Sequence, residues 1–130
     1  MNDIIILIGG MTVKLILDDT RTFPDNIFYN IVDTSADNIN LRRNGYNCVR
    51  TYDDCILLLK LFDKLDFISL DYHLGTDKTG LDVLIFMVVN NITTKHINIH
   101  SDHERGVPMM EEYVAKHFPD VRLTKNKIKL

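Results

Sequence analysis

Short apolar segments alternate along most of this chain with longer stretches in which apolar residues recur every three or four positions. The short segments have the length of β-strands and lie at 13–17, 47–50, 66–70, 97–99 and 121–124. Phe67, Ile68 and Leu70 form a nearly unbroken apolar run, as expected of a strand covered on both faces. This alternation predicts an α/β fold with a doubly wound, mostly parallel five-stranded sheet.

Three helices are expected between these strands, and each has a recognisable start or end. Thr51 and Thr79 stand directly before stretches with helical spacing, and a threonine hydroxyl can accept hydrogen bonds from the first free N–H groups of a helix. The third helix follows residues 102–106, with Pro108 near its first turn and Pro119 as its stop.

Two segments do not fit the alternation. Residues 20–46 are rich in Asn, Asp and Thr, with weak periodicity around Ile27 and Ile31, so we expect a long insertion in which the first helix is reduced or replaced by a long connection. Residues 1–10 include an apolar run that is too short to span a bilayer and lacks the basic start of a signal peptide. We interpret them as an N-terminal extension or an edge strand.

Composition supports one domain over residues 1–130. With 130 residues, 45% hydrophobic and 25% charged, the chain can bury a core of its own. Its formal charge of −3 is small and mixed, which argues against a strong nucleic-acid surface. The two cysteines make no disulfide framework, so a reducing cytoplasm is the expected location, without a membrane.

Carboxylates follow two of the predicted strands. Asp18 and Asp19 come directly after the first strand, and Asp71 comes directly after the third. Because the carboxyl ends of parallel strands meet at one edge of a sheet, we expect these side chains to converge. Carboxylates this close repel one another unless a cation neutralises them, and hard oxygen ligands suit Mg²⁺, with Mn²⁺ as the alternative. The sequence therefore predicts a metal-assisted phosphoryl site.

Five segments, taken in order, resemble the cyclic-phosphate-processing receiver family. They are Leu17-Asp-Asp-Thr-Arg-Thr-Phe-Pro24, Val49-Arg-Thr-Tyr52, Ile68-Ser-Leu-Asp-Tyr-His-Leu-Gly75, Thr79-Gly-Leu-Asp-Val-Leu84 and Ile99-His-Ser101. The resemblance implies a receiver or flavodoxin-like strand order, 2-1-3-4-5. It also implies that Asp18, Asp19 and Asp71 hold the divalent cation and that Asp71 accepts phosphate, since a carboxylate nucleophile can form an aspartyl phosphate.

The resemblance assigns roles to three further residues. Ser101 would hydrogen-bond a phosphoryl oxygen, and Arg21 would clamp the same group through its planar guanidinium. His100 matches the family's histidine before this serine and could act as general acid toward an oxygen leaving group.

The chain also departs from the family pattern. His73 stands where the family commonly has Asp, and His103 and Met109 replace other expected residues. Lys125, in the position of the receiver's basic residue, is followed by Asn126 instead of Pro. A transition-metal site built from His73, His103 and the carboxylates is therefore an alternative to the magnesium site.

Three functions remain open on these residues. The first is a metal-dependent phosphoesterase or phosphoryl-transfer activity on cyclic or terminal phosphates of nucleotides or RNA ends. The second is a stand-alone phosphoacceptor receiver in signalling. The third is a degenerate, phage-encoded receiver that binds a protein partner or a ligand.

Overall fold

The computed structural model describes residues 13–19, 29–35, 39–42 and 45–125. The predicted extension at 1–10 lies outside these residues, as do parts of the predicted insertion at 20–46. No helix within the described ranges is long and apolar enough to cross a membrane.

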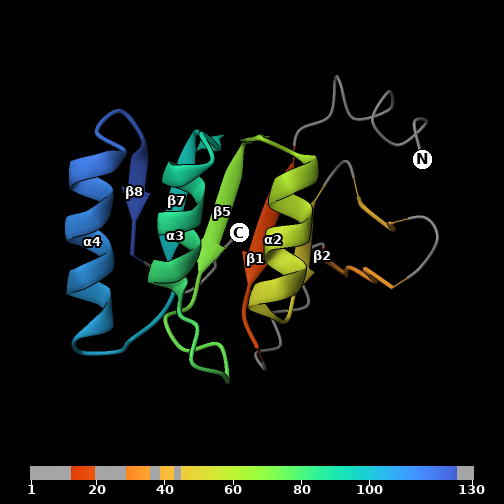
Figure 1. The fold of residues 1–130 in the computed structure, drawn as a ribbon, viewed down its shortest axis with the longest axis horizontal. Coiled ribbons are helices and arrows are strands. Elements are labelled where there is room, and N and C mark those ends of the chain that lie inside the picture. The colour runs from red at the N-terminus through yellow and green to blue at the C-terminus, as the bar shows by residue number, and fades with distance from the viewer. Residues whose placement is uncertain (1–12, 20–28, 36–38, 43–44, 126–130) are drawn as a thin grey trace.

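The described residues form a six-stranded parallel sheet with the order β2-β3-β1-β5-β7-β8 (Figure 1). Its strands are β1 (Lys14–Leu17), β2 (Tyr29–Ile31), β3 (Tyr46–Val49), β5 (Phe67–Leu70), β7 (His96–Ile99) and β8 (Arg122–Thr124). Five of them reproduce the order 2-1-3-4-5, which confirms the predicted fold class.

The main sheet has one described strand more than the five predicted. Strand β2 lies within the expected insertion and pairs with β3, where Ile31 stands beside Cys48. Its three residues are too few to show an alternation of apolar and polar positions, so the sequence pattern could not separate it from a loop. Two shorter strands, β4 (Lys64–Leu65) and β6 (Thr93–Thr94), pair with each other in a second sheet.

Helices α2 (Tyr52–Leu61), α3 (Gly80–Val89) and α4 (Gly106–His117) start as their sequences indicate, at Thr51 and Thr79 for the first two. The Asp54 N–H donates to Thr51 Oγ1 at 3.1 Å. At α3 the cap is reciprocal, because the Asp82 N–H donates to Thr79 Oγ1 at 3.4 Å while Asp82 Oδ2 accepts from the Thr79 N–H at 2.8 Å. Such a capping box satisfies two N–H groups that the helix itself leaves without partners.

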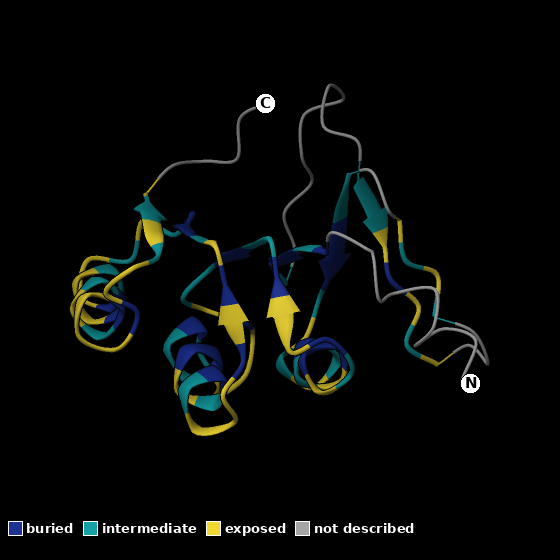
Figure 2. Cartoon of the chain, turned by 90° about the horizontal axis from the view of Figure 1, so that it is seen from above, coloured by how far each residue is buried: buried dark blue, intermediate teal, exposed yellow. Residues whose placement is uncertain are grey.

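All three described helices lie on one face of the sheet (Figure 2). Alternate strand residues fill the main hydrophobic core beneath them, including Leu15, Ile68 and Ile97. Because successive side chains of a strand point to opposite faces, Ile16, Ser69 and Asn98 face away from these helices. That second face is also buried, but its side chains range from apolar at Ile16 and Cys48 to polar at Ser69 and Asn98.

The described part of the 20–46 connection is tied to neighbouring elements by side chains. Buried Asn47 of β3 accepts the Arg42 N–H at 2.7 Å and donates to the Arg42 carbonyl at 3.1 Å. Thr34 donates its hydroxyl to Asp54 Oδ1 on α2 at 2.7 Å. The connection therefore packs against β3 and the start of α2.

Candidate metal and phosphate site

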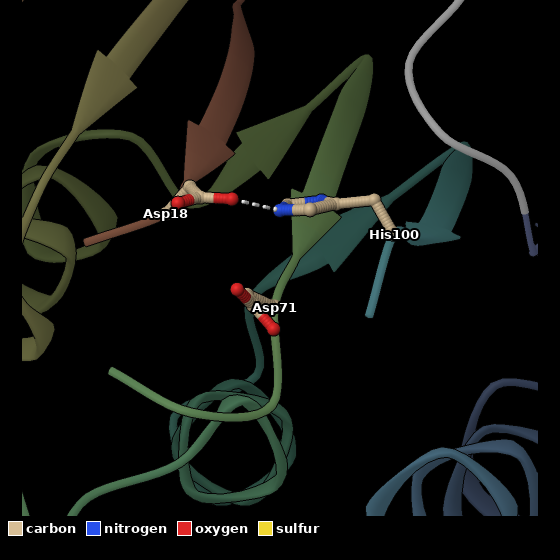
Figure 3. Close-up of side chains that lie close together, drawn as sticks. All are labelled: Asp18, Asp71 and His100. Carbon is tan, nitrogen blue, oxygen red and sulfur yellow. Dashed lines mark hydrogen bonds and ion pairs between the residues drawn. The ribbon is translucent and has the colours of Figure 1, made fainter. Parts of the chain in front are cut away.

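Asp18, Asp71 and His100 come together at the carboxyl ends of three adjacent strands (Figure 3). Each follows the last residue of its strand, β1, β5 and β7 respectively. One potential ligand atom from each lies within 4.8 Å of the others. The expected meeting of Asp18 with Asp71 is therefore present, and His100 joins them.

His100 is held between two polar groups inside the protein. Its Nε2 lies 2.8 Å from Asp18 Oδ2, and the side chains of His100 and Asp18 are 0% and 1% exposed. Its Nδ1 lies 2.7 Å from Ser69 Oγ. Both ring nitrogens thus have protein partners, and the nitrogen nearest the carboxylates already contacts Asp18.

Asp71 is the more accessible of the two carboxylates. It is half-buried, and its Oδ1 accepts the N–H of Tyr72 at 2.7 Å. Its own N–H donates to the Leu17 carbonyl at 3.2 Å, which links the ends of β5 and β1. A molecule from solvent would therefore meet Asp71 before Asp18.

Glycines allow two helices to approach the residues beside the site. A Cβ on Gly80 would lie 2.2 Å from the Asp71 carbonyl oxygen, so the start of α3 reaches this backbone only without a side chain. The Gly80 N–H also donates to the Tyr72 carbonyl at 2.9 Å. A Cβ on Gly106 would lie 2.3 Å from the Tyr72 ring, which packs against the start of α4.

The other residues singled out from the sequence lie in different surroundings. Asp19 is not in the group formed by Asp18, Asp71 and His100, and its Oδ2 lies beside Gly75, 3.1 Å from where a Cβ would stand. Ser101 is half-buried and its Oγ accepts the His103 N–H at 3.2 Å. Arg21 lies outside the described residues.

Tyr72, His73 and His103 form a cluster of rings beside Asp71. The Tyr72 and His103 rings stack with centroids 4.5 Å apart, and the His73 ring meets His103 edge-on at 4.6 Å. His103 Nδ1 accepts the Gly106 N–H at 2.8 Å. Neither histidine belongs to a described group of three metal-binding side chains, so the arrangement gives no support to the alternative transition-metal site.

Two positive charges lie near this edge of the sheet. Arg50 follows β3, and its Nη1 donates to the Asp18 carbonyl at 3.2 Å. Burial raises the pKa of the nearby Cys48 thiol to about 11; Asp18 adds to this rise and Arg50 opposes it. Lys125 pairs with Glu111 of α4 at 3.0 Å.

Three polar residues behind the site, buried Ser69 and Asn98 and half-buried Thr124, were not singled out from the sequence. Asn98 Nδ2 donates to Ser69 Oγ at 2.9 Å, and the Thr124 hydroxyl donates to Asn98 Oδ1 at 2.6 Å. The sequence carries a signal for Asn98, since polar and apolar residues alternate from His96 to His100. Such an alternation is typical of a strand with one polar and one apolar face.

Comparison with known proteins agrees with this geometry. Residues 13–116 match the cyclic-phosphate processing receiver domain, and this match covers most of the chain. Searches of curated proteins and of solved structures gave no match. The six-stranded order contains the receiver order, and Asp18 and Asp71 occupy the ends of its two central strands. The chain therefore belongs to the cyclic-phosphate processing receiver family.

Proposed function

We propose that this domain binds a divalent cation at Asp18 and Asp71 and processes cyclic or terminal phosphates of nucleotides or RNA ends. The observation that carries the proposal is the close approach of a half-buried carboxylate, Asp71, to a fully buried one, Asp18. Two such groups repel when both are ionised, and a cation between them removes that repulsion. Family membership supports phosphate as the ligand.

The donor atoms suit a hard divalent cation. Mg²⁺ is usually held by one or two carboxylates, with water and substrate phosphate as its remaining ligands. Asp18 and Asp71 would supply the carboxylates for Mg²⁺ or Mn²⁺, and Asp19 remains a candidate third ligand. The bound ion would neutralise charge on the phosphoryl oxygens.

Asp71 would act as the nucleophile because it is the accessible carboxylate. One of its oxygens would form a bond to phosphorus while the bond from phosphorus to one ring ester oxygen breaks, and the departing oxygen would take a proton from water. A second water would then form a bond to phosphorus while the bond from phosphorus to Asp71 breaks, which would release a phosphomonoester of the nucleotide or RNA end and restore the carboxylate. Ser101 would donate its hydroxyl hydrogen to a phosphoryl oxygen, and Arg21 would bind the same group.

His100 would act on Asp18 and not on the leaving group. Both of its ring nitrogens have partners, at 2.8 Å to Asp18 Oδ2 and 2.7 Å to Ser69 Oγ. An imidazole placed in this way holds a metal-binding carboxylate in one orientation. The general-acid role suggested by the family resemblance would require Asp18 to leave Nε2.

The test is turnover of 2′,3′-cyclic nucleotides and of RNA with cyclic-phosphate ends, with Mg²⁺ or Mn²⁺ present, followed by ³¹P NMR. We expect ring opening by the wild-type protein and its loss in Asp71→Asn. Asp120→Asn is the matched control, because it alters an exposed aspartate between α4 and β8, and it should leave turnover unchanged.

Two outcomes would redirect this proposal. If the folded wild-type protein leaves every such substrate intact but gains a phosphate at Asp71 from a small phosphoryl donor, the signalling alternative is favoured. If Mg²⁺ and Mn²⁺ also fail to raise the melting temperature, the metal site itself is wrong, because a ligand that binds only the folded state must stabilise it.

A further inference from the structure

A continuous row of hydrogen bonds crosses the sheet behind the site. It joins six side chains, here named the polar chain: His96, Thr124, Asn98, Ser69, His100 and Asp18. These residues come from β8, β7 and β5 and from the ends of β7 and β1. Its members from Asn98 to Asp18 are buried.

The amide of Asn98 fixes the direction of the polar chain. Its Nδ2 can only donate, and it donates to Ser69 Oγ at 2.9 Å. Its Oδ1 can only accept, and it accepts the Thr124 hydroxyl at 2.6 Å. Since Thr124 donates its hydroxyl hydrogen to Asn98, its oxygen accepts a hydrogen from His96 Nε2 at 2.8 Å.

The same direction continues to His100. Ser69 Oγ receives a hydrogen from Asn98, so its own hydrogen is available for His100 Nδ1 at 2.7 Å. A neutral imidazole that accepts at Nδ1 carries its hydrogen on Nε2. That hydrogen then points at Asp18 Oδ2, 2.8 Å away, whereas the opposite tautomer would set a nitrogen lone pair against the carboxylate.

Strand register places Ser69, Asn98 and Thr124 in one row of neighbouring residues that crosses the sheet. Cys48, Ile16, Ser69, Asn98 and Thr124 are consecutive neighbours across β3, β1, β5, β7 and β8. The row is apolar on β3 and β1 and polar only on the strands beside His100. A buried polar group costs free energy unless it is hydrogen-bonded, so packing alone would be served as well by apolar residues here.

We propose that Ser69, Asn98 and Thr124 are positioning residues that fix the Nε2–H tautomer of His100 and thereby orient Asp18 for the cation. The role in cation binding rests on the proposed function. Groups that hydrogen-bond to metal-binding side chains commonly change metal affinity when removed. Ser69 would act on the metal-binding Asp18 indirectly, through the ring of His100.

The first experiment is a long-range ¹H–¹⁵N NMR spectrum of the full chain at pH 8 without metal, with His100 assigned by its loss in His100→Asn. We expect wild-type His100 to be protonated at Nε2 only. Ser69→Ala should give a mixture of tautomers. Thr124→Val should shift the His100 signals, and Thr124→Ser, which keeps the hydroxyl, should restore them.

The second experiment is the affinity for Mg²⁺ alone, from melting curves at increasing Mg²⁺. Ser69→Ala should bind roughly 10-fold more weakly than wild type. Thr94→Val is the matched control, since it removes a buried threonine hydroxyl that donates to the His96 backbone carbonyl at 3.1 Å and not to a side chain of the polar chain. It should leave both the His100 signals and the Mg²⁺ affinity unchanged.

A wild-type ring protonated at Nδ1, or at both nitrogens, would overturn the proposal. So would variants of the polar chain whose spectra and Mg²⁺ affinities match those of Thr94→Val. If Ser69→Ala does not fold, the Thr124→Val and Thr124→Ser pair decides the question. The spectrum needs neither metal nor substrate, so failure of the proposed function would show separately, as a wild-type protein without any Mg²⁺ response.

Discussion

Individual residues at this site are constrained by available space as well as by chemistry. Gly80 is the clearest case, because the Asp71 carbonyl oxygen occupies the region where any larger residue would place its Cβ. Backbone cannot move aside as the end of a flexible side chain can. The start of α3 and the backbone of the proposed nucleophile therefore form one tightly fitted unit.

Gly80→Ala should lower the free energy of unfolding by about 1–3 kcal/mol, the usual cost of forcing extra atoms into a packed site. Urea denaturation followed by circular dichroism would measure this change. Val89→Ala on the same helix is the control, since Val89 is 72% exposed and should have little effect. A Gly80→Ala protein as stable as wild type would contradict the close fit.

His96, at the far end of the polar chain, should make stability depend on pH. Burial lowers its pKa from the ordinary 6.5, the nearby Arg122 lowers it further, and Asp66 opposes both. Between this lowered pKa and 6.5 the unfolded chain binds more protons at His96 than the folded one, so this contribution to stability is complete above pH 6.5 and is lost as the pH falls.

The measurement is urea denaturation of wild type and His96→Gln from pH 8 to pH 5. The difference in unfolding free energy between the two proteins should be constant above pH 6.5 and should decrease below it. A difference that stays constant over the whole range would show that His96 titrates alike in both states.

The residues of the site lie at the ends of secondary-structure elements. Strands β1, β5 and β7 deliver Asp18, Asp71 and His100, and α3 begins against the Asp71 backbone. The capping box at Thr79 and Asp82 fixes where that helix starts. A change in this cap should therefore affect both stability and the position of the loop after β5.

Thr79→Ala should lower the unfolding free energy by about 1 kcal/mol, as loss of an N-cap hydroxyl usually does. Thermal melts of Thr79→Ala beside Thr76→Ala would test this, because the Thr76 hydroxyl accepts only a local turn bond from the Lys78 N–H at 3.1 Å. Equal losses in both variants would mean that the capping box adds nothing to α3.

Local signals in the sequence account for the elements that could be predicted. Apolar runs and threonine caps identified five strands and the starts of two helices, because these features act within a few residues. They could not identify β2, whose three residues are too few to show an alternation of apolar and polar positions. Nor could they show that Asp18 contacts His100 while its neighbour Asp19 lies beside Gly75. These contacts join residues far apart in the sequence, so local patterns carry no information about them.

At the scale of the whole molecule, the sheet separates two buried regions that each contain one cysteine. Cys55 lies in the main core under the helices, and Cys48 lies with Ile16 on the opposite face. Burial raises the pKa of Cys55 to about 12 and that of Cys48 to about 11. Both thiols should therefore be unreactive in the folded protein, since the thiolate is the reactive form.

Alkylation by iodoacetamide at pH 8, followed by intact mass, should leave native protein unmodified and add two groups in denaturing urea. Peptide mapping at intermediate urea would show which face of the sheet opens first. Rapid modification of Cys48 in the native protein would show that the face opposite the helices is accessible.

The unequal burial of the two carboxylates also has a kinetic consequence. Asp18 lies at the inner end of the site against His100, so a ligand approaches from the side of Asp71 and of the loops that follow β5 and β7. Changes in those loops, for example at Tyr72 or His103, should alter how fast a ligand arrives and leaves. Changes behind Asp18 should instead alter how tightly it is retained once it has arrived.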